Sequence, residues 1–147
     1  MTDKTKINDL YLTPLKKIDT PGGDVLRALK KSEKNFSGFG EAYFSVIKYG
    51  AKKGWKKHKK MISNIIVPFG EVRFVLFDDR QGSTSYGNFV DVTLSPANYK
   101  RLCIPPLLWM AFQGVGKTDS ILLNVANIEH QPDESESKSL GEINYNW

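Results

Sequence analysis

The amino-acid sequence predicts an all-β fold, built as an antiparallel sandwich or barrel. Short segments rich in Val, Ile, Phe and Tyr recur after residue 40, separated by Gly, Pro, Asn, Asp and Ser. The breaks come about every 8–12 residues, the spacing typical of antiparallel sheets. The chain has 147 residues, of which 40% are hydrophobic and 25% charged, as expected for one globular domain with its own core.

The first part of the chain is expected to be a lead-in over residues 1–35. Residues 1–22 lack periodic hydrophobicity and end in the turn-forming sequence Thr-Pro-Gly-Gly. Asp24 is a candidate N-cap for a short helix that would run through about Lys31. The sequence therefore predicts an irregular start followed by a short helical segment.

Strands are predicted for the rest of the chain. Residues 131–139 are expected to form a solvated loop, and residues 141–147 a last strand or a packing tail. The predicted strands fall within residues 41–50, 61–70, 71–80, 88–95, 101–106, 107–114 and 120–130.

Residues 51–61 form a strongly basic run with six lysines, Trp55 and His58. Lysines beside an aromatic side chain can contact nucleic acid, but no known nucleic-acid-binding motif accompanies the run. As a strand, the run would place Lys56 and His58 on one face and Trp55 on the other. A pocket for an anionic small molecule would offset the cost of burying a lysine, so we favour a pocket and expect no nucleic-acid partner.

Residues 111–118, Ala-Phe-Gln-Gly-Val-Gly-Lys-Thr, approach the spacing of a phosphate-binding loop. That loop needs a parallel sheet with crossover helices around it. Only 29 residues follow Thr118, too few to complete such a sheet. We therefore interpret the segment as a glycine-rich hairpin turn.

Localisation is expected to be cytoplasmic. Cys103 is the only cysteine, which excludes an internal disulfide and suits a reducing compartment. The first residues are polar and lack the apolar core of a signal peptide. No apolar run approaches the roughly 18 residues of a transmembrane helix, so no membrane association is expected.

The basic run and its surroundings resemble the first motif of the cupins. Gly50, His58 and Gly70 fall at the motif's spacing, and Lys56 and Ser63 replace its other metal ligands. Met110 stands where the second motif has its histidine. The resemblance implies a jelly-roll β-barrel. Ammonium, hydroxyl and thioether groups are poor ligands for a divalent metal beside one imidazole, so we expect no metal and no cofactor.

Within the cupins, the chain resembles the dTDP-4-dehydrorhamnose 3,5-epimerase family over roughly residues 37–147. The resemblance implies one cupin domain over residues 1–147 that acts as an isomerase on a nucleotide-linked 4-keto-6-deoxyhexose, carried by dTDP or CDP. It also implies a homodimer formed by strand exchange and a role in O-antigen or other surface polysaccharide synthesis. The segments that carry it are GFGEAYFS, KGWKKH, GEVRFVLFDDR, LSPANYKRLCIPP, LLNVANIEHQPDE and INYNW.

The family's site residues transfer only in part. Its phosphate-binding Arg corresponds to Lys53 and its catalytic His to Lys56, with His58 two residues later. Its catalytic Tyr corresponds to Asn124, and its Asp partner to the base has no counterpart near residues 140–142. Two further candidates, Tyr43 and Glu41, lie near the family's nucleotide-contacting strand.

The expected chemistry is deprotonation beside the ketone to give an enolate. We assign the base to His58, because an unperturbed imidazole is largely neutral at pH 7 whereas a lysine is protonated. Lys56 would stabilise the enolate, although the reverse assignment remains open. The loss of the family's Tyr at Asn124 favours epimerisation at C3 alone. The alternatives are a 3,5-epimerase, a 3,4-ketoisomerase, and a non-catalytic sugar-nucleotide-binding cupin.

Overall fold

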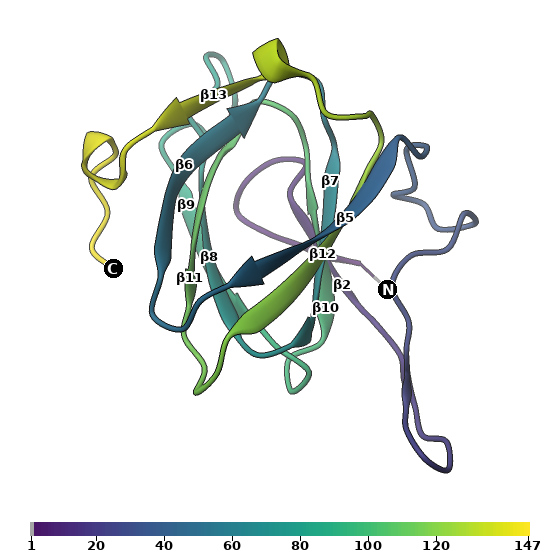
Figure 1. Cartoon of the computed structure of the whole chain (residues 1–147). Coiled ribbons are helices and arrows are strands. Elements are labelled where there is room, and N and C mark those ends of the chain that lie inside the picture. The colour runs from purple at the N-terminus through teal and green to yellow at the C-terminus, as the bar shows by residue number, and fades with distance from the viewer. Residues whose placement is uncertain (1) are drawn as a thin grey trace.

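Two antiparallel sheets face each other in the computed structural model, which describes residues 2–147 (Figure 1). The six-stranded sheet has the order β1 (Asp3–Lys4), β2 (Tyr11–Pro14), β10 (Lys100–Ile104), β7 (Ser63–Phe69), β12 (Ser120–Ala126) and β5 (Glu41–Ile47). The five-stranded sheet has the order β13 (Ser135–Lys138), β6 (Lys52–His58), β11 (Trp109–Gly114), β8 (Val72–Phe77) and β9 (Phe89–Leu94).

The prediction of an all-β fold is confirmed, and the paired sheets are consistent with a cupin jelly roll. Each predicted strand segment contains a strand, and the basic run forms β6. The hairpin turn predicted at residues 111–118 is wrong: residues 111–114 belong to β11, and residues 115–119 cross to β12 in the other sheet. No strand pairing links the two large sheets within residues 2–147. The expected barrel is therefore an open two-sheet roll.

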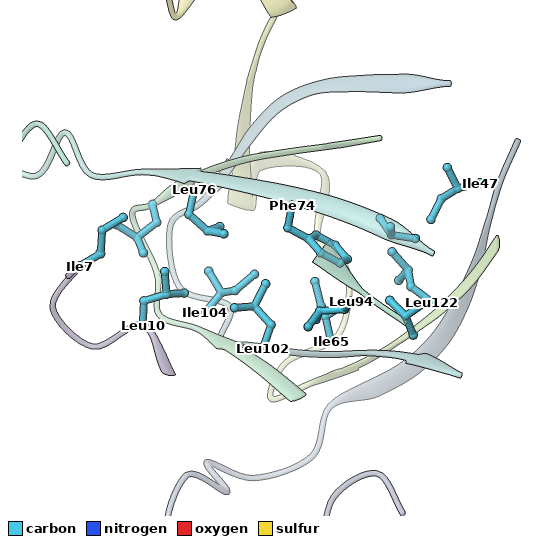
Figure 2. Close-up of a cluster of buried hydrophobic side chains, with 13 residues drawn as sticks. Ile7, Leu10, Ile47, Ile65, Phe74, Leu76, Leu94, Leu102, Ile104 and Leu122 are labelled. Carbon is cyan, nitrogen blue, oxygen red and sulfur yellow. The ribbon is translucent and has the colours of Figure 1, made fainter. Parts of the chain in front are cut away.

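The main core fills part of the space between the two sheets (Figure 2). Phe74 and Leu76 from β8 meet Ile65 of β7, Leu102 of β10 and Leu122 of β12, all almost fully buried. Along β8 and β12, core side chains alternate with outward ones, as the pleat requires. The core thus defines the inward face of the strands that contribute to it.

A second apolar cluster covers the outer face of the five-stranded sheet. Trp55 and Trp109 lie in it with Ile143, and Tyr145 and Trp147 of the C-terminal tail pack against them. The Trp55 indole N–H donates to the carbonyl of Leu140, which lies in the short 3-10 turn η2 (Leu140–Glu142), at 3.3 Å. Residues 141–147 are therefore a packing tail, one of the two predicted alternatives.

The helical part of the predicted lead-in is wrong. Residues 17–26 form a hairpin of β3 (Lys17–Ile18) and β4 (Val25–Leu26), turned by Gly22 and Gly23 at positive φ. The carbonyls after this hairpin accept bonds from side chains in and just before β10: Tyr99 donates to Arg27 at 2.8 Å, and Arg101 to Ala28 at 3.0 Å. These contacts replace the bonds of a helix, so tertiary structure overrides local propensity.

Two further expectations need correction. The start of the chain is not wholly irregular, because β1 and β2 extend the six-stranded sheet. Residues 131–139 are not a solvated loop: the 3-10 turn η1 (Pro132–Glu134) leads into β13, and Glu134 is buried. Within residues 2–147, no helix has the length and hydrophobicity to span a membrane.

Candidate active site

The inward face of the six-stranded sheet changes from apolar to polar along its strands. On β12, Leu122 belongs to the core and Asn124 is the next inward residue. On β5, Ile47 belongs to the core, and Tyr43 and Glu41 follow on the same face. Tyr43 pairs directly with Asn124. The core therefore gives way to hydrogen-bonding groups at one end of the roll.

The opposing wall comes from β6, whose orientation is fixed by Trp55. Because Trp55 is buried in the outer cluster, its neighbour Lys56 faces inward, opposite Met110 of β11. Alternation places His58 on the same inward face. Lys56 is exposed, whereas the His58 side chain is only 21% exposed. The basic pair thus lines an inner surface that remains open to solvent.

A β-bulge adds Lys53 to this inward face. Lys56 pairs with Met110 and Lys53 with Phe112, so three steps along β6 match two along β11. In a regular strand, residues three apart point to opposite faces, but an extra residue restores them to the same face. Directly paired side chains share a face, and Phe112 packs against the core. Lys53 therefore lies on the inward side with Lys56.

The remaining lysines of the run do not form one cationic surface. Lys57 lies on the outer face, 2.6 Å from Asp79 and 4.8 Å from the centroid of the Trp109 ring. Lys52 lies over the Trp147 ring at 5.6 Å. The strand thus divides the run between two faces, with part of the outer charge neutralised. This arrangement argues against a nucleic-acid-binding strip, which needs its cations along one exposed surface.

The principal contact of the site joins His58 to Glu134. The Nδ1 atom of His58 lies 2.6 Å from one Glu134 oxygen, and the Glu134 side chain is only 4% exposed. The other oxygen accepts the backbone N–H groups of Lys60 and Met61, both at 2.9 Å. Burial raises the pKa of Glu134, but these hydrogen bonds outweigh it and leave the pKa below the usual value. Glu134 is therefore ionised at neutral pH.

An ionised carboxylate can only accept hydrogen bonds, so Nδ1 of His58 must carry the hydrogen that joins them. The neutral ring then has its lone pair on Nε2. The backbone carbonyl of His58 also accepts from Leu107 N–H at 2.7 Å, which fixes the end of β6. The Glu134 contact thus fixes one tautomer of His58, and the Leu107 bond fixes its position.

The six-stranded sheet contributes a second hydrogen-bonded group. Asn124 is 2% exposed, and its amide nitrogen lies 3.0 Å from the Tyr43 hydroxyl and 3.4 Å from the Ser63 hydroxyl. Its amide oxygen accepts the backbone N–H of Asn64 at 3.1 Å. Glu41 accepts the backbone N–H of His130 at 2.9 Å. Each of these polar groups is oriented by a neighbour.

A solved structure over most of the chain gives the family. The chain is 37% identical to the dTDP sugar isomerase of Desulfovibrio desulfuricans G20, with a TM-score of 0.89. The match covers 92% of this chain and 87% of that one. The chain belongs to the dTDP-4-dehydrorhamnose 3,5-epimerase-like family of sugar-nucleotide epimerases and isomerases. No family model matches it.

Two other proteins are similar to the chain. The dTDP-4-dehydrorhamnose 3,5-epimerase of Sulfolobus tokodaii shares the fold at a TM-score of 0.85 and 22% identity, covering 99% of this chain and 85% of that one. The probable low-salt glycan biosynthesis epimerase Agl13 of Haloferax volcanii is 26% identical over 84 residues. That match covers 56% of this chain and 54% of the protein, so the chain spans about half the length of this curated relative.

The structure places all six predicted site residues on the inward faces of the two sheets. Lys53, Lys56 and His58 lie on β6, and Tyr43, Glu41 and Asn124 lie on β5 and β12. The sequence prediction missed Glu134, because it sought an acidic partner near residues 140–142. In the sequence, Glu134 was only an acidic residue within the loop predicted at residues 131–139. Its burial and its contact with His58 required the structure.

Glu134 should stabilise the fold in a pH-dependent way. Its pKa in the folded chain lies below the usual 4.5, so its contribution is complete above about pH 4.5 and is lost as pH falls through the folded-state value. We expect Glu134→Gln to lower the free energy of unfolding at pH 7 by about 1.5–3 kcal/mol, the range for a charged hydrogen bond. Urea unfolding of both proteins at several pH values measures the difference.

Glu136→Gln is the matched control, because Glu136 is an exposed carboxylate on the same segment. It should change stability by about 0.5 kcal/mol or less at every pH. Two results would contradict this role of the buried carboxylate. One is a loss of unfolding free energy in Glu134→Gln that stays constant down to pH 3. The other is a loss equal to that of the control.

Proposed function

We propose that this protein is a metal-independent epimerase of a nucleotide-linked 4-keto-6-deoxyhexose, acting at C3 in surface polysaccharide deoxysugar synthesis. The observation that carries the proposal is the His58–Glu134 pair, facing inward beside Lys56 in a chain of this family. The free Cys103 fits a reducing cytoplasm as the site of action.

The reaction begins at the carbon next to the ketone. His58 Nε2 takes the C3 proton, and the electron pair of the broken bond moves onto the ketone oxygen as an enolate. Glu134 stabilises the imidazolium that forms, as a carboxylate partner does for a catalytic histidine. The Lys56 ammonium supplies positive charge for the enolate oxygen. No ion pair engages Lys56 within residues 2–147.

Substrate binding is assigned to the other inward residues. Lys53, turned inward by the bulge, offers a point charge to the diphosphate. Asn124 and Tyr43 present hydrogen-bonding groups to the sugar, and Glu41 lies at the same end of β5. Metal independence is supported by the donor types: an ammonium, a thioether and a hydroxyl occupy the cupin ligand positions at Lys56, Met110 and Ser63.

Specificity for C3 is supported by Asn124. A carboxamide cannot replace the proton-donating phenol that the family pattern has at this position. Loss of that donor on β12 fits a site that inverts one carbon instead of two. A 3,4-ketoisomerase on the same substrate class is the second candidate, because the similar Desulfovibrio protein is a dTDP sugar isomerase. Both reactions share the first deprotonation by His58.

Proton exchange in deuterated water tests the function. The protein is incubated with dTDP- and CDP-4-keto-6-deoxyglucose and followed by NMR. We expect deuterium at C3 with inversion there, and His58→Asn should abolish this exchange while keeping substrate affinity nearly unchanged. His130→Asn changes the chain's other histidine, which lies outside β6, and should leave exchange intact.

Other outcomes decide between the alternatives. Deuterium at both C3 and C5 makes the protein a 3,5-epimerase, and a carbonyl moved to C3 makes it a ketoisomerase. If the protein binds the dTDP- or CDP-linked sugar but neither sugar exchanges a proton, catalysis is contradicted and the protein is a sugar-nucleotide-binding protein. Exchange retained in His58→Asn transfers the role of base to Lys56.

A homodimer is the second part of the proposal. The outer face of the six-stranded sheet exposes Phe44, Val46 and Phe69, each more than half accessible. Their strand partners Ile121 and Leu123 are also apolar and lie on the same face. This patch lies behind the wall that carries Tyr43 and Asn124. Because the family resemblance implies two copies, we assign the patch to a second copy of the chain.

Phe44→Lys should weaken that dimer, because it places a charge in the middle of an apolar interface. Phe44 is 69% exposed in the isolated chain, so the fold should tolerate the change. Sedimentation velocity should show a dimer for the wild type and a shift toward monomer for the variant. Tyr86→Lys, at another exposed aromatic (56% accessible) outside this patch, is the control. A monomeric wild type at all concentrations would contradict the assignment.

A further inference from the structure

We infer that Tyr43 is the proton donor on the face of the sugar opposite His58, and that Asn124 positions it. This inference rests on the proposed epimerase function and supplies the acid that this function lacks. The family pattern would place a phenol at position 124, on β12. In this chain the phenol comes instead from the neighbouring strand, β5.

The pairing register brings the two side chains together. Tyr43 and Asn124 are direct partners in the antiparallel pair β5–β12, so their side chains lie next to each other on one face. The Asn124 nitrogen lies 3.0 Å from the Tyr43 oxygen. Replacing the phenol on β12 by a shorter amide leaves room for the phenol from β5. The donor is thereby displaced by one strand.

Hydrogen bonding fixes the orientation of the Asn124 amide. Its oxygen accepts the buried N–H of Asn64 at 3.1 Å, and leaving that donor without a partner would be costly. The NH2 group must then face Tyr43 and Ser63, its two other neighbours. With 2% of Asn124 exposed, water does not offer an alternative set of partners.

The direction of the Asn124–Tyr43 bond follows from this orientation. The amide nitrogen has hydrogens and no free lone pair, so it donates and the Tyr43 oxygen accepts. The hydroxyl hydrogen of Tyr43 is therefore not used in this bond. No other hydrogen bond in residues 2–147 engages the Tyr43 hydroxyl. Tyr43 thus keeps a proton available for a molecule bound between the sheets.

The location of Tyr43 suits the stereochemistry. His58 lies on the inward face of the five-stranded sheet, and Tyr43 lies on that of the six-stranded sheet, which faces it (Figure 1). Inversion at a carbon requires that the proton leave from one face and return to the other. A sugar ring held between the sheets presents its two faces to these two residues.

The complete step balances as follows. The C3–H bond breaks, its proton passes to His58 Nε2, and the electron pair becomes the enolate. The enolate re-forms the ketone as C3 takes the hydroxyl proton of Tyr43 on the opposite face. The phenolate then regains a proton from water, and the imidazolium loses one to water. No oxidant or co-reactant is needed.

Tyr43→Phe separates exchange from inversion. Without the phenol, His58 can still remove the C3 proton and return a deuteron to the same face. We expect the rate of inversion to fall by about 10²–10⁴-fold, the range for loss of a general acid, while C3 deuterium incorporation with retained configuration persists. NMR in deuterated water measures both rates in one sample. Tyr49→Phe, at a 64% exposed tyrosine beyond the end of β5, should change neither rate.

Asn124→Asp tests the positioning role with almost the same shape. The introduced carboxylate can still accept the Asn64 N–H, but its second oxygen accepts the Tyr43 hydroxyl hydrogen instead of donating to it. We expect inversion to fall relative to exchange, a ratio that a general loss of stability would not change. Asn124→Ser removes the donor to Tyr43 and should lower the same ratio.

The outcomes separate this inference from the function on which it rests. If the wild type exchanges no proton on any nucleotide, the epimerase proposal fails. If the wild type exchanges and inverts but Tyr43→Phe inverts at the wild-type rate, the proposal stands and Tyr43 is not the donor. If Tyr43→Phe loses exchange and inversion equally, Tyr43 serves substrate binding and the inference is likewise overturned.

Discussion

The short contact between His58 and Glu134 is the interaction on which the site depends. One oxygen of the buried carboxylate holds the imidazole, and the other binds two backbone N–H groups just beyond β6. Glu134 therefore both orients the His58 ring and anchors the segment that follows β6. A carboxylate that is both buried and hydrogen-bonded in this way stays ionised, which fixes the proton on Nδ1 and leaves Nε2 free.

The rest of the fold serves to bring two polar walls together. The core between the sheets sets the inward face of β5 and β12, and the outer tryptophan cluster sets that of β6. A single bulge in β6 then adds Lys53 to the face that carries Lys56 and His58. Cations on one wall and hydrogen-bonding groups on the other suit a ligand with an anionic diphosphate and a neutral sugar, as the proposed substrate has.

Much of the fold could be predicted from sequence, because alternation and turn residues mark each strand locally. The family followed from the order of short segments, and the inward placement of Lys56 and His58 from strand periodicity. The lead-in conformation could not be predicted, since Tyr99 and Arg101, distant in sequence, bond the carbonyls that follow the β3–β4 hairpin. Neither could Glu134, the bulge at Lys53, or the Tyr43–Asn124 bond, because each depends on pairing register between segments far apart in the chain.

The tautomer of His58 is the most direct test of the account. The chain has two histidines, so nitrogen-15 NMR of the wild type, with His130→Asn for assignment, resolves the His58 ring. We expect a hydrogen on Nδ1 and a lone pair on Nε2 in the neutral ring, with the Nε2 signal shifting when dTDP is added. A hydrogen on Nε2, or a ring unaffected by the nucleotide, would contradict a base held by Glu134 between the sheets.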